Sequence, residues 1–230
     1  MPYPFAHPAA VLPLPRLMGR FAVPSALAIG SITPDLWYFV PFVERHESHS
    51  LAGLAWFCLP ASLLIYALFH LLLKQPLIAL LSPRLRAFTP ARLPAAAWSA
   101  VIASLLAGAL THLAWDALTH SHDEAWRHNW LQHASTACGS LVLGGWIWRK
   151  LRRAPAAPSA LSPLARGAIL LGFLAIAALA ALHEAALPAP DLPALRQFLR
   201  TGGLAALEAL GAALFIYCLL FQRKMARRAA

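Results

Sequence analysis

The sequence predicts an all-α protein embedded in a membrane: a polytopic helical bundle of about five transmembrane helices, with a re-entrant or interfacial segment near the N-terminus. Three observations predict this class. Hydrophobic residues make up 60% of the 230 residues, charged residues only 12%, and the mean hydropathy is +0.61. A soluble globular domain carries roughly 25% charged residues. The apolar residues also gather into long runs, which is typical of helices that span a bilayer.

Five runs are long and apolar enough to be spans. The first, Leu51–Leu73, contains no Asp, Glu, Lys or Arg. Its roughly 23 residues would reach about 34 Å as a helix, against a hydrocarbon core of about 30 Å. The other four expected spans are Ala95–Leu118, His133–Trp148, Gly167–Leu187 and Gly202–Phe221. The run from His133 to Trp148 is the shortest of the five, so its ends are the least defined.

The stretch Ala22–Val43 is apolar but contains three prolines and Asp35. Proline breaks a regular helix because it lacks the backbone N–H and its ring clashes with the preceding turn. We therefore expect a short helix, a turn at Ser31–Asp35 and then an interfacial or re-entrant piece. Trp37 and Tyr38 suit the level of the lipid headgroups.

Basic residues alternate between the loops. Loops 74–94 and 149–166 and the tail 222–230 hold thirteen Lys and Arg. The alternate segments hold four: Arg45 just before the first span, then Arg127, Arg196 and Arg200. By the positive-inside rule, the basic loops and the C-terminus are cytoplasmic in a multi-pass protein of the bacterial inner membrane. Topology and anionic headgroups also explain the net charge of +10, so membrane lipids, and no nucleic acid, are the expected partners.

A basic linker rich in Pro and Ala, residues 151–166, divides the chain. It would separate a membrane domain of residues 1–150 from a two-helix membrane hairpin of residues 167–230. The first domain holds most of the histidines. The sequence leaves the oligomeric state open.

Polar residues cluster at the expected outer ends of the spans. His112 and Asp116 form an HxxxD pair, and residues four apart share one face of a helix. Imidazole nitrogen and carboxylate oxygen together suit Zn²⁺ and related cations. His120 and His122 compete for one role, and His7 lies near enough to the start to fold back onto the cluster. The candidate metal ligands are His7, Asp35, His49, His112, Asp116, His120, His122 and His133.

Three functions fit this pattern. The first is metal-dependent hydrolysis at the outer membrane–water interface, with one or two divalent ions of the zinc type. The second is a non-catalytic metal-binding or structural membrane protein, in which a His/Asp pair is a hydrogen-bonded knot. The third is a metal transporter, but transporter ligands usually lie near the midplane of the bilayer on broken helices. These candidates lie at span ends, which argues against transport.

Five motifs resemble the DUF4184 family of bacterial membrane proteins over roughly residues 1–150. They are FAHPAAVLPL at Phe5–Leu14, IGSITPD at Ile29–Asp35, SHSLAGL at Ser48–Leu54, THLAWDALTH at Thr111–His120 and LQH at Leu131–His133. The order of ligand-type residues is more distantly similar to YdjM-type inner-membrane metal-dependent hydrolases and to zinc-dependent phospholipase C.

The distant resemblance implies a ligand set. One metal would be held by Asp35, His49, His112 and Asp116. His7 would join Asp116 at another metal, with Asp116 bridging, and His120 or His122 with His133 would begin a further site. Ala137 stands where the phospholipase pattern has a glutamate, so one or two ions are expected. The implied reaction is hydrolysis of a phosphodiester or ester in a lipid-like substrate, with Asp116 and Asp35 as the catalytic carboxylates.

Overall fold

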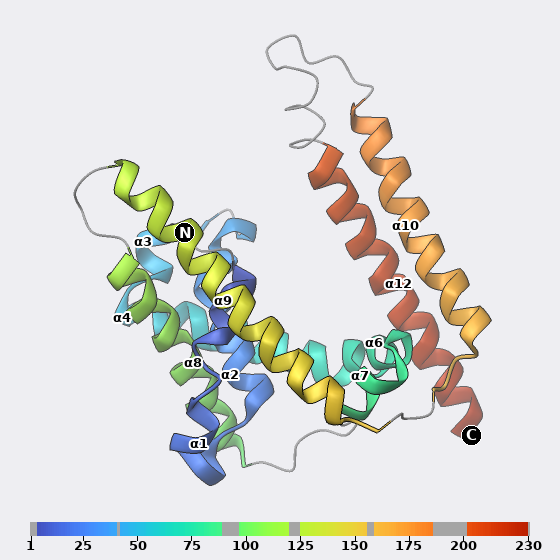
Figure 1. The fold of residues 1–230 in the computed structure, drawn as a ribbon, viewed down its shortest axis with the longest axis horizontal. Helices are drawn as coiled ribbons and strands as arrows, with labels where there is room; N and C mark the ends of the chain where they lie inside the picture. Colours follow the sequence, from blue (N-terminus) through green and yellow to red (C-terminus); the bar gives the residue numbers. More distant parts are fainter. Residues whose placement is uncertain are drawn as a thin grey trace. The chain divides into compact units, whose positions relative to one another are not determined.

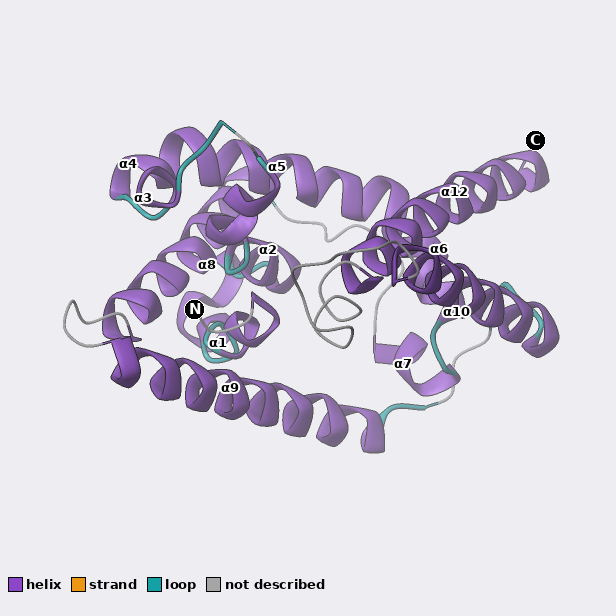
Figure 2. Ribbon diagram, turned by 90° about the horizontal axis from the view of Figure 1, so that it is seen from above, coloured by secondary structure: helices purple, strands orange, loops and turns teal. Residues whose placement is uncertain are grey.

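The structure of the chain is a computed structural model, and it describes residues 4–40, 42–88, 97–119, 125–155, 159–185 and 202–229 (Figure 1). Within these ranges every regular element is helical, which confirms the all-α class (Figure 2). The contacts divide the chain into two units: Met1–Phe69 with Arg92–Arg153, and His70–Ala91 with Ala154–Ala230. Residues 70–91 thus group with the C-terminal helices, although the sequence placed them in the first domain.

The elements of the first unit are mostly short until α8. They are η1 (Pro4–Ala9), α1 (Leu14–Met18), η2 (Gly19–Phe21), α2 (Pro24–Gly30), η3 (Thr33–Phe39), α3 (Arg45–Ser48), α4 (Leu51–Gly53), η4 (Leu54–Cys58), α5 (Leu59–Leu68), α8 (Trp98–Thr119) and α9 (Ala125–Arg153). Helix α2 is the short helix expected after Ala22. A 3-10 helix, η3, follows it where a turn and an interfacial piece were expected.

The crossing of α2 and α8 organises the first unit (Figure 1). Gly30 faces the backbone of Leu105, and Gly108 faces the backbone of Leu27 and Ser31, so closely that a Cβ on either glycine would overlap the facing carbonyl oxygen. Small residues at such crossings let two helix backbones approach within a membrane. This close approach brings the end of α2 to the middle of α8, where the polar cluster begins.

Ser104 fixes the start of α2 against α8. Its hydroxyl accepts from the backbone N–H of Val23 at 2.9 Å and donates to the carbonyl of Phe21 at 3.0 Å. Around this contact lies a buried apolar core, which also includes Leu105. The hydroxyl thereby satisfies two backbone groups that no helix pairs, which matters most in an apolar surrounding.

The second unit begins within the π-helix η5 (Phe69–Leu73). It also contains the helices α6 (Lys74–Leu80), α7 (Pro83–Phe88), α10 (Pro163–Ala185) and α12 (Gly203–Ala229). Helices α10 and α12 pack side by side (Figure 1), with Phe173 and Tyr217 in edge contact at 5.8 Å. Proline at position 76 has no N–H to donate to the carbonyl of Leu72, four residues earlier. Gln222 supplies the missing donor, because its Nε2 lies 3.1 Å from that carbonyl.

Four stretches of the described residues are long and apolar enough to cross a membrane: Leu51–Leu80, Trp98–Leu118, Pro163–His183 and Gly203–Arg227. The expected span at His133–Trp148 is not among them. It lies within the 29-residue helix α9, which opens with polar residues. The apolar part that remains is shorter than the ~20 residues a span needs. By length and composition, therefore, the described chain has four candidate spans where the sequence predicted five.

Candidate metal centre

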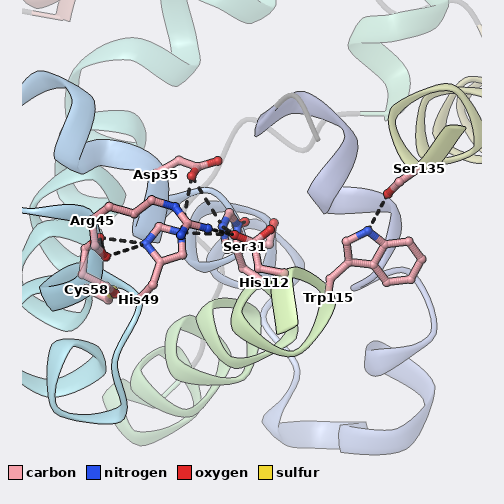
Figure 3. A network of polar contacts seen from close by, with 10 residues as sticks. Ser31, Asp35, Arg45, His49, Cys58, His112, Trp115 and Ser135 are labelled. Atoms are coloured by element: carbon pink, nitrogen blue, oxygen red, sulfur yellow. Dashed lines mark hydrogen bonds and ion pairs between the residues drawn. The ribbon is translucent and has the colours of Figure 1, made fainter. Parts of the chain in front are cut away.

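Four of the predicted ligands come from three regions of the first unit and meet at one place (Figure 3). His112 and Asp116 lie one turn apart near the end of α8, Asp35 lies in η3, and His49 follows α3 as its C-terminal cap. All four side chains are at most 9% exposed. Polar groups this deeply buried are costly unless a partner compensates for the lost water.

A backbone carbonyl fixes the orientation of His112. Its Nδ1 lies 2.8 Å from the carbonyl oxygen of Ser31, at the end of α2. A carbonyl can only accept, so Nδ1 carries the hydrogen and the other ring nitrogen, Nε2, points into the cluster. Metal-ligating histidines are usually oriented in this way, with one ring N–H given to a carbonyl or carboxylate. The α2–α8 crossing therefore sets which nitrogen of His112 is offered.

His49 is held in the same manner from the other side. The hydroxyl of Ser48 donates to the carbonyl of Arg45 at 3.1 Å, so its oxygen accepts from His49 Nδ1 at 2.9 Å. Nδ1 also lies 3.1 Å from the Arg45 carbonyl. A reciprocal capping box between Glu44 and Glu47 secures this short helix. As in His112, the hydrogen is on Nδ1 and Nε2 faces the cluster.

The Nε2 atoms of His49 and His112 lie at similar distances from the carboxylates of Asp35 and Asp116. His49 Nε2 lies 3.6 Å from Asp35 Oδ1 and 3.4 Å from Asp116 Oδ2, and His112 Nε2 lies 3.6 Å and 3.9 Å from the same two oxygens. These separations are too long for strong N–H···O hydrogen bonds, which measure ~2.7–3.2 Å. Two ligands at ~2.1 Å from one ion are ~3.4 Å apart when the geometry is tetrahedral. The four nitrogen–oxygen separations are therefore close to the spacing of neighbouring ligands around one ion.

His7 extends the cluster from η1. Its ring stacks on that of His112, with the centroids 3.8 Å apart and the planes 24° from parallel. Burial, together with the neighbouring His112, lowers the pKa of His7 to about 4, so its ring is neutral near pH 7. Candidate ligand atoms of His7, Asp35 and His112 lie within 4.8 Å of one another, and so do those of His49, His112 and Asp116. The resemblance had paired His7 with Asp116.

Asp35 carries a charge in this buried place. Burial alone would raise the pKa of Asp35, but the imidazoles of His112 and His49 that face it hold that pKa well below its usual range. Among the described residues, both Asp35 oxygens and the Nε2 atoms of His7, His49 and His112 are buried with no hydrogen-bond partner. A buried charged carboxylate among such nitrogens needs a cation beside it, either a metal ion or protons on the rings.

Arg45 is the residue that sequence reasoning missed. Its Nη2 donates to Asp116 Oδ2 at 3.0 Å, and its side chain is 40% exposed (Figure 3). The sequence counted Arg45 only as a loop charge. Two signals were present: it is the sole Lys or Arg between Phe21 and the first span, on the side where basic residues are scarce, and it precedes His49 by four residues.

The remaining predicted ligands do not join this cluster in the described structure. His133 lies on α9 with an exposed side chain and belongs to neither ligand group. His120 and His122 lie outside the described residues. The compact part of the predicted site is therefore His7, Asp35, His49, His112 and Asp116, with Arg45 at its rim.

The comparison with protein families agrees with the motifs. The family described as "Domain of unknown function (DUF4184)" matches residues 1–130. The chain belongs to the DUF4184 family. This match includes every residue of the cluster and ends before most of α9, whereas the sequence motifs suggested about 150 residues. No curated protein matches the chain, and no solved structure matches it. The family-wide part of this DUF4184 chain is thus the part that builds the buried His/Asp cluster.

Proposed function

We propose that the cluster binds a divalent metal ion of the zinc type and that the protein is a metal-dependent hydrolase acting on lipid-like phosphodiesters or esters. The single observation that carries the proposal is the geometry of the two histidines. Each gives its Nδ1 hydrogen to the protein and turns Nε2 toward two carboxylates at 3.4–3.9 Å. A structural knot would close such contacts to hydrogen-bond length, whereas a metal site keeps them apart by the width of the ion.

The cluster offers both ligands for the metal ion and a carboxylate to orient the attacking water. Candidate ligand atoms within 4.8 Å of one another form two sets of two imidazoles and one carboxylate: His7, Asp35 and His112, and His49, His112 and Asp116. Catalytic zinc sites use a set of this kind with a fourth position open to water. A bound metal would lower the pKa of that water to near 7 and polarise the bond to be cleaved. Asp116, held by Arg45 at 3.0 Å, is placed to act as a fourth or bridging ligand or to accept a proton from the water.

The surroundings favour a substrate with an anionic head. Arg45 is half-exposed and uses one N–H donor on Asp116, and a guanidinium has five donors in a planar fork that suits phosphate oxygens. Large apolar side chains stand exposed close by in the sequence: Phe39 four residues after Asp35, Leu51 two after His49, and Leu118 two after Asp116. A charged site whose contributing segments also expose large apolar side chains fits a protein that acts on a headgroup phosphodiester at a membrane surface.

The proposal places the protein in the inner membrane of a bacterium with the C-terminus in the cytoplasm and the cluster on the outer face. The support is the bias of thirteen basic residues against four. This alternation requires α9 to cross the membrane, although its composition falls short of a span. At the C-terminal end of α9, Lys150 and Arg152 lie over the rings of Trp146 and Trp148 at 5.8 Å and 4.8 Å. Such pairs are typical anchors at a membrane–water interface.

Cysteine labelling tests this orientation. Single cysteines replace His46, Arg84 or Arg153 in a chain whose own cysteines are serine, and a membrane-impermeant maleimide is added to intact cells. We expect His46→Cys to react, and Arg84→Cys and Arg153→Cys to react only after lysis. Reaction of Arg153→Cys in intact cells would mean that α9 does not cross.

Metal content is the direct test of the site. Wild-type protein should purify with about one zinc-type ion per chain, and Asp35→Asn and His49→Gln should lose most of it while still inserting into the membrane. His133→Gln is the matched control, because this histidine is exposed and lies apart from the cluster. Hydrolysis is then measured on panels of phosphodiesters and esters with added Zn²⁺ or Mn²⁺. A wild-type protein that purifies without metal and stays inert on these panels would leave a structural His/Asp knot as the function of the cluster.

A further inference from the structure

A cavity of about 190 Å³ lies in the first unit between η1, α8 and α9. Its walls are almost wholly apolar and are formed by three alanines at positions 6–10, Trp115 of α8, and Cys138, Gly139 and Val142 of α9. Apolar cavities of about 150 Å³ stay dry and bind molecules of the size of benzene. The occupant that fits this cavity is therefore an apolar group.

The cavity exists because the residues around it are small. A Cβ on Gly139 would come within 3.0 Å of the carbonyl oxygen of Ala6, so η1 and α9 approach there at backbone distance. Beside that contact no large side chain fills the space. The indole N–H of Trp115 donates to Ser135 Oγ at 2.6 Å and ties α8 to α9 next to the cavity (Figure 3). Close approach on one side and this hydrogen bond on the other hold the space open.

His7 joins the cavity to the buried cluster. It lines the cavity, stacks on His112 at 3.8 Å, and belongs to a ligand group with Asp35. At the α9 wall, Cys138 is exposed and Val142 is 54% exposed. An elongated molecule could thus place a polar head at the cluster and an apolar chain in the cavity, with the rest of the chain continuing over the apolar surface of α9.

We propose that the cavity holds one alkyl chain of the amphiphile whose phosphodiester or ester lies at the cluster. This inference rests on the proposed hydrolase function and names its substrate class as single-chain or double-chain amphiphiles. If each methylene group occupies about as much space as a water molecule, roughly 30 Å³, the cavity takes about six. Each buried methylene contributes about fourfold in affinity, so binding should rise steeply up to about six carbons and then level off.

The test uses the full chain in detergent and a methyl hexyl phosphodiester with a diazirine at the end of its hexyl chain. After illumination, mass spectrometry locates the label. We expect it within residues 6–10 and 135–142, with competition by methyl hexyl phosphate and at least tenfold weaker competition by methyl ethyl phosphate. Cys138→Phe should cut labelling at least fivefold because the ring fills the cavity, and Cys138→Ser is the matched control that should retain it. Val142→Phe, one turn further along α9, is the second filling variant.

The outcomes separate this inference from the proposed function. A thermal unfolding midpoint in detergent equal to that of wild type shows that a filling variant is folded. Label that scatters over α10 and α12, or that Cys138→Phe and Val142→Phe both leave unchanged, overturns the alkyl-chain site. Hydrolysis of the ethyl and hexyl diesters at equal rates without cavity labelling keeps the hydrolase and rejects the chain site. Cavity labelling in a protein that holds no metal and hydrolyses nothing keeps the chain site and rejects the hydrolase.

Discussion

Two candidate membrane helices each carry a carboxylate, and their surroundings differ completely. Asp116 on α8 is 5% exposed and is met by Arg45 and His49 from other segments of the first unit and by His112 one turn earlier on α8. Glu208 on α12, in the second unit, is exposed. Of the residues in the most apolar stretch of each helix, 39% are buried for α8 and 11% for α12. Of these two carboxylates, therefore, Asp116 lies among polar side chains from other elements and Glu208 lies at the surface.

The largest expected effect comes from separating α2 and α8, because their crossing builds the cluster. Gly108→Leu would drive a side chain into the backbone of Leu27 and Ser31. Overpacking of this kind costs about 3 kcal/mol or more when backbone must move. We expect a large drop in the thermal unfolding midpoint in detergent and loss of bound metal together.

Gly211→Leu on α12 is the control for that change. A Cβ there meets no neighbouring atom within 4 Å, so stability and metal content should stay close to wild type. Equal damage from the two substitutions would contradict the view that only the first unit is tightly packed around its polar residues.

The next effect is on the orientation of His49. Ser48→Ala removes the hydroxyl that accepts from His49 Nδ1 at 2.9 Å, while the carbonyl of Arg45 remains. Loss of one such supporting hydrogen bond typically lowers metal affinity by about 10- to 100-fold, and we expect a value near tenfold. Competition with a fluorescent zinc chelator measures it. Ser159→Ala in the second unit is the control, and an affinity unchanged in both variants would show that the Ser48 hydroxyl does not orient His49 for metal binding.

The sequence predicted which polar residues lie together better than it predicted the number of membrane spans. The spacing of His112 and Asp116 put both on one face of a helix, and their shared side with Asp35 and His49 suggested that the four would meet, as they do. Whether they bind metal stays a prediction. The choice of ring nitrogen could not be predicted, because it depends on the carbonyl of Ser31, which reaches His112 only through the folded crossing.

The bounds of α9 differ from the expected span for a different reason. Hydropathy favoured a span at His133–Trp148, but the helix runs from Ala125 to Arg153 and packs against η1. A half-polar helix makes its backbone hydrogen bonds internally and can pack against a neighbouring element. The hydrophobic periodicity of its sequence therefore does not reveal whether lipid or protein lies beside it. The position of His7 was open in the sequence for the same reason, since only this packing folds η1 back onto the cluster.

A smaller effect is expected in the second unit. Gln222→Leu removes the amide that donates to the carbonyls of Leu71 and Leu72 at 3.3 Å and 3.1 Å. Hydrogen bonds between helices in membranes contribute about 0.6 kcal/mol on average, so unfolding should be easier by about that amount. Thermal unfolding in detergent measures it, and metal content should not change. A loss of metal in Gln222→Leu would show that the second unit supports the cluster.

The smallest effect should come from Glu208, the exposed carboxylate of the comparison above. Glu208→Gln keeps the shape of an exposed side chain on α12 and removes its charge. Exposed substitutions away from caps and networks usually change stability by less than about 0.5 kcal/mol. We therefore expect wild-type metal content, activity and unfolding midpoint, whereas Asp116→Asn should lower the first two. If Glu208→Gln lowered metal content as Asp116→Asn does, burial by neighbouring elements would not be what distinguishes a functional carboxylate in this protein, and α12 would belong to the site.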